Sequence, residues 1–300
     1  MRILLVVDGS HYSAMATATL KVLQLPAPTR VTIMTVIPEF TFLGGITLDT
    51  FRGGASSKKK AQRARAVELV SAPARLLTES NLKVDKLVRW GNPTEVILKV
   101  ADKIGASLVV MGAKGLTDPV SFRLGSVAHK VMRQTKASVL LVRKRISTTE
   151  KRVLLATDGS AGSDAAARFL LELSLPQPSQ VIVVTALQSH TPSIMKTPTL
   201  DLESDRRLLT ALQSAEETQA RRIIARTEEQ FKKRGYQTTS RIVRGGAAES
   251  VLTTAKEHNP DIIALGSRGL TGLESILLGS VAERVARYAR CSVLIGRPPV

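Results

Sequence analysis

A spacing of glycines occurs twice in this sequence, and the two copies lie 154 residues apart. In the first copy, Gly112 and Gly115 are followed by nine residues and then by Gly125, and the second copy repeats this spacing from Gly266. Each copy follows an apolar run typical of a buried strand and precedes a helical pattern. Glycine at such a junction lets backbone N–H groups approach an anion without a Cβ atom in the way. We expect two nucleotide-sized sites, or one ancestral site copied and kept as architecture.

The duplication covers nearly the whole chain. The opening segment 1–10 returns as segment 151–160, with Asp8-Gly9-Ser10 repeated as Asp158-Gly159-Ser160. The shift here is 150 residues, so the second copy carries a small net insertion in its middle. The join near residues 146–151 is short and polar, which suggests that the two halves pack against each other. We predict two domains, 1–147 and 148–300, paired within the chain.

Short β-rich runs alternate with longer helical patterns in both copies. The runs are dominated by Val, Ile and Leu, as in strands buried on both faces of a sheet. Strands that alternate with helices imply right-handed crossovers and a parallel sheet. The fold class we predict is α/β, with two tandem open five-stranded parallel-sheet domains and helices on both faces. The predicted strands are Arg2–Asp8, Arg30–Ile37, Lys83–Trp90, Ser107–Gly112, Ser138–Arg143, Arg152–Asp158, Gln180–Ala186, Gln237–Arg244, Asp261–Gly266 and Ser292–Gly296.

The single cysteine and the short N-terminal apolar run exclude several classes of protein. The 300 residues carry one cysteine, Cys291, which excludes a disulfide framework and a cysteine-ligated zinc site. Its apolar neighbours predict a buried, inert thiol. The N-terminal apolar run is too short for a signal peptide or a membrane span, so we expect a cytoplasmic protein with no membrane contact.

The net charge of +18 is concentrated in the first half, where Lys and Arg outnumber Asp and Glu by 14 in residues 1–147. This excess gathers between residues 58 and 75. A solvated helix face and a polyanion-binding patch are both compatible with such a cluster. Aromatic residues make up only 3% of the chain, so stacking platforms for single-stranded nucleic acid are not expected. The basic residues in question are Lys58, Lys59, Lys60, Arg63, Arg65 and Arg75.

Other chemistry has little support. No G-x4-G-K-[ST] loop occurs, so the usual lysine and magnesium ligands of P-loop enzymes are missing. The four histidines show no metal-ligand spacing. Ser10 and Ser160 lack a nucleophile elbow and a histidine partner. No residue is an obvious base for activating water, although slow hydrolysis of a bound nucleotide stays open.

The carboxyl ends of parallel strands are where such sheets bind ligands. At this edge, each copy places an aspartate, Asp8 or Asp158, suited to accept hydrogen bonds from ribose hydroxyls. Ser280 can donate to a phosphate oxygen or cap its helix, and Arg268 adds a cation. Each feature also has a plainer explanation as a turn or a cap, but their joint occurrence in both copies favours binding.

The arrangement resembles the universal stress protein family. The matching residues are the two Asp-Gly-Ser openings, the two G-x2-G-x9-G-S loops, the stretches 268–272 and 278–282, and the closing strand 291–295. The resemblance implies a Rossmann-like fold of the adenine nucleotide alpha hydrolase type that binds ATP, with which Mg²⁺ can associate. It places adenine near Val36 and Ala186, ribose near the two aspartates, and phosphates on the glycine loops.

The positions we expect around the nucleotide follow from the loops and from this resemblance. In the first copy they are Asp8, Val36, Met111, Gly112, Gly115, Gly125, Ser126 and Val127. In the second copy they are Asp158, Ala186, Leu265, Gly266, Arg268, Gly269, Gly279, Ser280 and Val281.

The first copy departs from the second at Asp118-Pro119, where the second has Gly272-Leu273. Asp118 adds negative charge near the expected phosphates, so the second site is the cleaner of the two. We expect an ATP-binding tandem universal stress protein that acts as a stress-response regulator or signalling module, with homodimers possible. The alternatives are a partner-binding scaffold without nucleotide and a slow ATPase or nucleotide switch.

Overall fold

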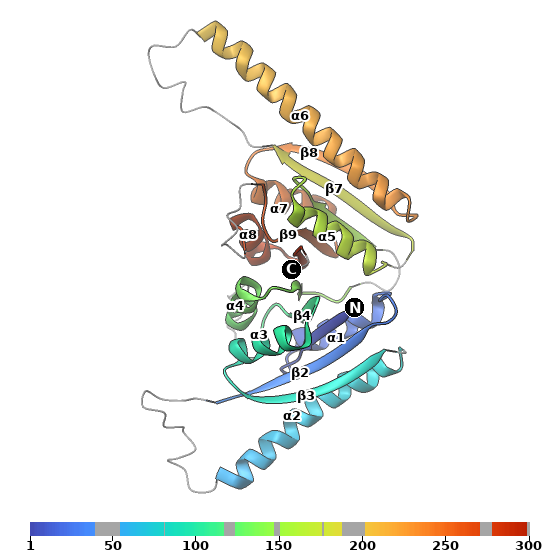
Figure 1. The fold of residues 1–300 in the computed structure, drawn as a ribbon, viewed down its shortest axis with the longest axis vertical. Helices are drawn as coiled ribbons and strands as arrows, with labels where there is room; N and C mark the ends of the chain where they lie inside the picture. The colour runs from blue at the N-terminus through green and yellow to red at the C-terminus, as the bar shows by residue number, and fades with distance from the viewer. Residues whose placement is uncertain are drawn as a thin grey trace.

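The computed structural model describes residues 1–39, 55–80, 82–116, 124–146, 151–175, 177–187, 202–270 and 278–298. The domain boundary predicted at 147/148 and the Asp118-Pro119 departure lie outside these residues. Figure 1 shows the fold as a ribbon.

The strands predicted from the sequence form one mostly parallel sheet. The pairing order is β3-β2-β1-β4-β5-β10-β9-β6-β7-β8. The strands of the first half are β1 (Arg2–Val6), β2 (Arg30–Pro38), β3 (Lys83–Gly91), β4 (Leu108–Gly112) and β5 (Ser138–Val142). Those of the second half are β6 (Lys151–Ala156), β7 (Ser179–Leu187), β8 (Gln237–Arg244), β9 (Ile262–Gly266) and β10 (Ser292–Gly296).

The two halves meet along one antiparallel strand pair. Strand β5 pairs with β10 through Leu141↔Val293, Leu140↔Leu294 and Val139↔Ile295, whereas the other adjacent strands of the sheet pair in parallel. The sequence predicts two tandem open sheets paired within the chain, and the structure joins them into a single continuous sheet. The reason is that β5 and β10 are both apolar edge strands of their own halves, and each leaves backbone groups that the other can pair.

Helices cover both faces of the sheet, as the alternating pattern predicts. On one face, Met15, Val70, Leu170 and Ile224 belong to one core, which involves α1, α2, α5 and α6. On the other face α3, α4, α7 and α8 contribute to a second core. The helices are α1 (His11–Val22), α2 (Ala55–Thr78), α3 (Pro93–Ile104), α4 (Ser126–Gln134), α5 (Ala161–Glu172), α6 (Leu202–Lys232), α7 (Ala247–His258) and α8 (Ser280–Tyr288).

Alternation along the strands divides their side chains between the two cores. In β1, Ile3 and Leu5 belong to the core beneath α1 and α2, whereas Leu4 belongs to the core beneath α3 and α4. All three side chains have no exposed surface. This explains why the strands read as continuous apolar runs and not as alternating ones.

Polar contacts also join the halves beside the β5–β10 pair. His129 of α4 lies with its Nε2 atom 2.9 Å from Oε1 of Glu283 on α8. Arg143 donates to the carbonyl oxygen of Ala286, and Arg297 donates to that of Met132 over 2.6 Å. Each arginine therefore satisfies a carbonyl near the C-terminal end of the other half's helix. Helices α4 and α8 lie near the centre of the molecule, and α2 and α6 at its opposite ends (Figure 1).

Candidate functional site

A cavity of about 370 Å³ lies at the carboxyl ends of β1, β2 and β4 in the first half. Most of the positions expected around a nucleotide in this half line it. They are Asp8, Val36, Met111, Gly112, Gly115, Ser126 and Val127. Gly125 stands one residue before this wall, as the N-cap of α4. The sequence favoured the second site, but the structure describes a cavity of nucleotide-binding size at the first.

The carboxylate of Asp8 accepts hydrogen bonds from two loops, the turn after β1 and the glycine loop after β4. Its Oδ1 atom accepts a hydrogen bond from the Ser10 amide at 2.9 Å, and its Oδ2 atom accepts one from the Leu116 amide at 3.3 Å. Asp158 makes the same two contacts, with the amides of Ser160 at 3.0 Å and Leu270 at 3.2 Å. Each aspartate therefore holds its own turn, as the plainer explanation required, and also fixes the glycine loop at the mouth of its site.

Two of the loop glycines are required by packing between helix and strand. A Cβ atom on Gly112 would lie 2.7 Å from Cβ of Tyr12 on α1. On Gly266, it would lie 2.5 Å from the amide nitrogen of Ser163 on α5. Real Cβ atoms do not approach other heavy atoms this closely, so both positions must be glycine for the first helix of each half to reach the sheet.

Helices α4 and α8 each begin at the residue after the last glycine of the preceding loop. Gly125 and Gly279 are the N-caps of α4 and α8, and neither helix has a side-chain cap. The amides of these glycines donate to carbonyl oxygens within their own loops, Gly125 to Ala113 at 2.8 Å and Gly279 to Ser267 at 2.7 Å. Those two amides are thus already used and cannot be the donors to an anion.

The remaining donors belong to the first turns of α4 and α8. Ser280 is the first residue of α8 and does not cap it, which corrects one of the readings left open by the sequence. The first N–H groups of a helix have no acceptor within it, and they point along the positive end of its dipole. At α4 this turn includes Val127 and Ala128, which line the cavity. An anion in the cavity would find these donors in its wall.

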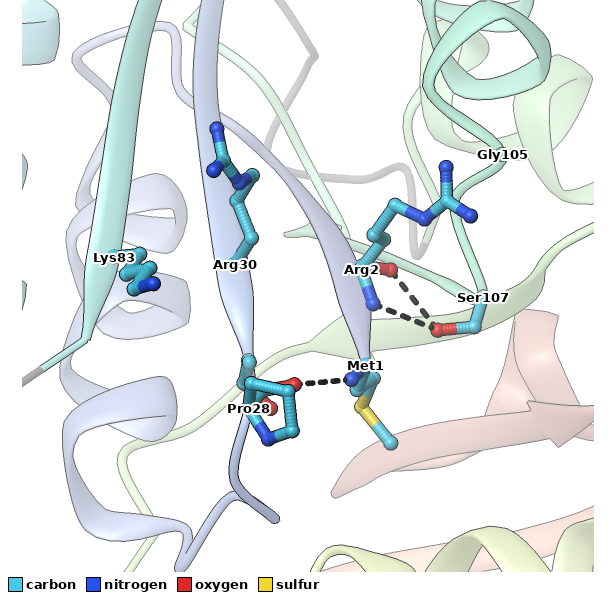
Figure 2. A pocket seen from close by; sticks show the side chains of 8 residues that line it. Met1, Arg2, Pro28, Arg30, Lys83, Gly105 and Ser107 are labelled. Carbon is cyan, nitrogen blue, oxygen red and sulfur yellow. Dashed lines mark hydrogen bonds between the residues drawn. The ribbon is translucent and has the colours of Figure 1, made fainter.

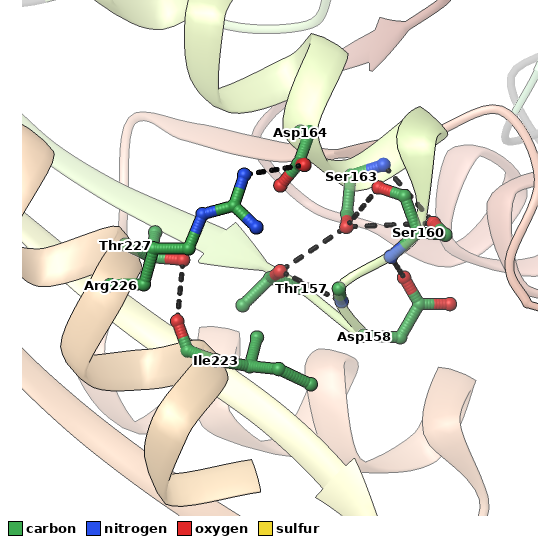
Figure 3. Close-up of polar contacts among 9 residues, drawn as sticks. Thr157, Asp158, Ser160, Ser163, Asp164, Ile223, Arg226 and Thr227 are labelled. Atoms are coloured by element: carbon green, nitrogen blue, oxygen red, sulfur yellow. Dashed lines mark hydrogen bonds and ion pairs between the residues drawn. The ribbon is translucent and has the colours of Figure 1, made fainter. Parts of the chain in front are cut away.

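Hydroxyl groups at the start of α5 form hydrogen bonds that stabilise the N-terminus of this helix (Figure 3). Ser160 accepts from the Ser163 amide at 3.3 Å and donates to the carbonyl oxygen of Arg268 at 3.2 Å. Ser163 lies 3.2 Å from the hydroxyl of Thr157. These contacts make Ser160 a cap that ties α5 to the second glycine loop.

The second-half positions lie at the equivalent edge of the sheet. Ala186 is the penultimate residue of β7, and Leu265 and Gly266 end β9. Gly269 faces Asp158, because a Cβ atom there would lie 2.6 Å from the carboxylate Oδ2. Ser280 and Val281 open α8. The repeated geometry therefore extends to the aspartate, the loop and the helix start.

Helix α2 contributes residues that the sequence reasoning did not place in a site. Gln62, Arg65, Ala66 and Leu69 line the same cavity as the glycine loop. The sequence did contain a signal, since Arg65 belongs to the basic cluster, but no local motif reveals which side of a long helix faces a loop far along the chain.

A larger hollow of about 540 Å³ lies at the opposite, amino-terminal edge of the sheet (Figure 2). Several of its polar groups make hydrogen bonds to nearby backbone. The Met1 ammonium donates to the Pro28 carbonyl at 2.7 Å, and the Ser107 hydroxyl contacts the backbone of Arg2. It contains none of the predicted site residues, so the smaller cavity is the candidate site.

The described residues also bear on metal binding, on the reactivity of the cysteine and on membrane-spanning helices. Within the described part of the chain, no group of three or more His, Cys, Asp or Glu side chains could hold a metal ion. Cys291 is buried, as predicted, and burial raises the pKa of its thiol to about 11. Among the described residues, no helix combines the length and the apolar character needed to cross a bilayer.

Comparison with known proteins accounts for the repeated geometry. The family model described as "Universal stress protein family" matches residues 1–143 and, a second time, residues 150–297. The chain belongs to the universal stress protein family. Because the family unit matches twice, it is a tandem universal stress protein.

Relatives of this tandem universal stress protein match one unit at a time. Universal stress protein MJ0531 of Methanocaldococcus jannaschii is 29% identical over 149 residues, which cover 50% of this chain and 83% of that protein. A universal stress protein of Thermus aquaticus is also 29% identical, over 147 residues, and these cover 49% of this chain and 98% of the relative.

Solved structures match the whole tandem chain. A universal stress protein from Archaeoglobus fulgidus superposes with a TM-score of 0.63 at 21% identity and covers 99% of this chain and 98% of its own. A putative universal stress protein from Pseudomonas aeruginosa gives a TM-score of 0.60 at 17% identity, with 99% and 93% covered. At these identities the likeness concerns the fold alone.

Proposed function

We propose that this tandem universal stress protein binds ATP at the cavity of its first half, and at the equivalent edge of its second half, as a stress-response regulator or signalling module of the cytoplasm. The observation that carries the proposal is the cavity itself, which brings Asp8, the glycine loop and the first turn of α4 together. A carboxylate beside a helix N-terminus suits a ribose linked to phosphates.

The same cavity argues for binding and against efficient hydrolysis. Asp8 is the one carboxylate among the residues found to line it, and both of its oxygens accept hydrogen bonds from backbone amides. A group held in this way has a structural task and is poorly placed to take a proton from water. We therefore propose a binding protein, to which Mg²⁺ comes with the nucleotide.

The experiment removes backbone donors without breaking a helix. Proline suits the first position of a helix, where it deletes one N–H group and keeps the backbone angles. The N-caps Gly125 and Gly279 have the extended conformation that proline requires of the preceding residue. Ser126→Pro and Ser280→Pro therefore test the two sites separately, and Ala247→Pro at the start of α7 controls for proline itself.

Equilibrium dialysis with labelled ATP, with and without Mg²⁺, measures the outcome. We expect saturable binding by the unmodified chain, loss of one site in each serine variant, and no change in Ala247→Pro. Absence of saturable binding at millimolar ATP by folded protein would favour a partner-binding scaffold. Phosphate release that disappears in the serine variants would instead support a slow ATPase.

A further inference from the structure

Helices α2 and α6 occupy the same place in the two halves, and they differ in charge. Helix α2 carries six basic residues and one acidic residue, whereas α6 carries six of each sign. Several charges of α6 are paired within the helix, as in Arg221–Glu217 at 2.7 Å and Lys232–Glu228 at 3.0 Å. Helix α2 therefore presents a local positive excess that α6 lacks.

The packing of each helix against its β-strand-to-helix turn fixes which residues correspond. A Cβ atom on Gly9 would lie 2.9 Å from Leu69 of α2, and one on Gly159 would lie 2.9 Å from Ile223 of α6. Figure 3 shows Ile223 near Asp158 and Thr157 at that turn. Leu69 and Ile223 are thus equivalent. Counting back along both helices, Gln62 and Arg65 correspond to Glu216 and Gln219.

This correspondence gives the two sites opposite charge. Around the first cavity stand Arg65 and Lys114 with one carboxylate, Asp8. The matching positions of the second half hold a single cation, Arg268, with the carboxylates Asp158 and Glu216. No ion pair or hydrogen bond occupies Arg65 among the residues that the structure describes, and its side chain is exposed. Arg65 is thus available for a ligand.

We propose that Arg65 is the phosphate-anchoring residue of the first site and that the two sites differ in how strongly they favour a triphosphate. The first site favours the polyphosphate form, a nucleoside triphosphate, because Arg65 lines the same cavity as the glycine loop and can pair with phosphate oxygens. The second site, with the neutral Gln219 at that place and Glu216 nearby, favours the triphosphate over adenine ligands with fewer phosphates less strongly. This inference rests on the proposed function and specifies the ligand preference of each site.

The test isolates one site at a time in the full chain. Ser280→Pro leaves the first site as the reporter, and Ser126→Pro leaves the second. In the first-site reporter, Arg65→Gln installs the residue type of the second half. It should weaken ATP about tenfold and leave adenosine unchanged, since only the phosphates carry charge. Arg65→Lys should restore most of the ATP affinity, because it keeps the cation.

Arg75→Gln is the matched control. It removes the same charge from the same helix about 15 Å away along the axis, where Arg75 lies 3.4 Å from Glu68 on the exposed face. We expect it to leave ATP affinity unchanged, which separates a local contact from the general attraction of a basic protein for an anion.

The second-site reporter supplies an independent measurement. Its preference for ATP over adenosine should be smaller than that of the first site, and Gln219→Arg, the reverse exchange, should increase it. Displacement of a fluorescent adenine nucleotide gives all these affinities. Equal losses of ATP and adenosine in Arg65→Gln, an unchanged ATP affinity, or identical preferences at the two sites would each overturn the inference. Failure of the unmodified chain to bind ATP would instead overturn the proposed function.

Discussion

Cys291 illustrates how the environment of a single residue sets its chemistry. Only 5% of the residue is exposed, and it belongs to the core beneath α7 and α8. Burial raises the pKa of the thiol to about 11 and outweighs the opposite influence of Lys144 and Arg143. The thiolate is the nucleophilic form of cysteine, so this residue stays unreactive well above neutral pH.

Alkylation measures this directly. At pH 8 the raised pKa alone reduces the thiolate fraction about 100-fold relative to a thiol with a pKa of 9.0, and burial slows access further. We expect iodoacetamide to modify Cys291 at least that much more slowly in native protein than in protein unfolded in urea. As the pH rises toward 11, the native rate should climb. Native and unfolded rates within tenfold of each other would contradict this prediction.

Substitution of Gly266 tests whether the loop glycine is required for close packing of α5 against β9. Its substitution by alanine forces a Cβ atom onto the backbone of Gly162 and Ser163, which cannot rotate away as a side chain could. We expect Gly266→Ala to lower the free energy of unfolding by about 1–3 kcal/mol, measured by urea denaturation. Gly279→Ala is the control, because the nearest atom, the Ser267 carbonyl oxygen, lies 3.4 Å away. Equal losses in both variants would show that packing is not the cause.

At the scale of elements, α3 and α7 are the same helix in the two halves with different N-terminal caps. Asn92 caps α3, and its Oδ1 atom accepts from the Thr94 amide at 3.0 Å and the Glu95 amide at 3.5 Å. Gly246 stands at the start of α7 and has no side chain to offer. The first helix therefore satisfies two amides that the second leaves to other partners.

Asn92→Ala should lower the free energy of unfolding by about 1 kcal/mol, because those amides lose their acceptor while the helix stays. Gly246→Ala is the matched control on α7, where no side-chain cap is lost and the added Cβ atom requires only that the flexible Glu249 carboxylate, 2.5 Å away, moves aside. Urea denaturation followed by circular dichroism distinguishes them. A loss for Asn92→Ala no larger than for Gly246→Ala would mean that the side-chain cap contributes nothing.

The helices and strands themselves could be predicted well from the sequence, but which elements lie next to each other across the two halves could not. The ranges predicted for β8 and β10 match the structure, because apolar runs and turn residues act locally. The β5–β10 pair could not be predicted, since it joins residues about 150 positions apart and no local pattern encodes that register. The wall that α2 gives the cavity escaped prediction for the same reason.

At the scale of the whole molecule, the two halves share one sheet and two cores. Leu140 and Leu294 lie in the same core, and Val139 and Val293 lie in the other, all fully buried. The buried apolar seam and the exchanged arginine contacts of Arg143 and Arg297 should hold the halves together without a covalent link.

A protease site placed within residues 147–150 tests this. We expect the cleaved halves to migrate together in size-exclusion chromatography under native conditions and to separate only in denaturant, because separation would expose both edge strands to water. Cleavage without denaturant that yields two separate peaks would show that the β5–β10 pair does not hold the molecule together. An uncleaved sample gives the reference elution volume.

The contact between His129 and Glu283 determines which halves can pair favourably with each other. The two residues hold the same position of the repeat, 154 residues apart, yet one is an imidazole and the other a carboxylate. Two second halves meeting in this way would set glutamate against glutamate, and two first halves would set imidazole against imidazole. Pairing of a first half with a second half is therefore favoured over pairing of two identical halves. In this respect the chain behaves as a heterodimer whose two subunits are covalently linked.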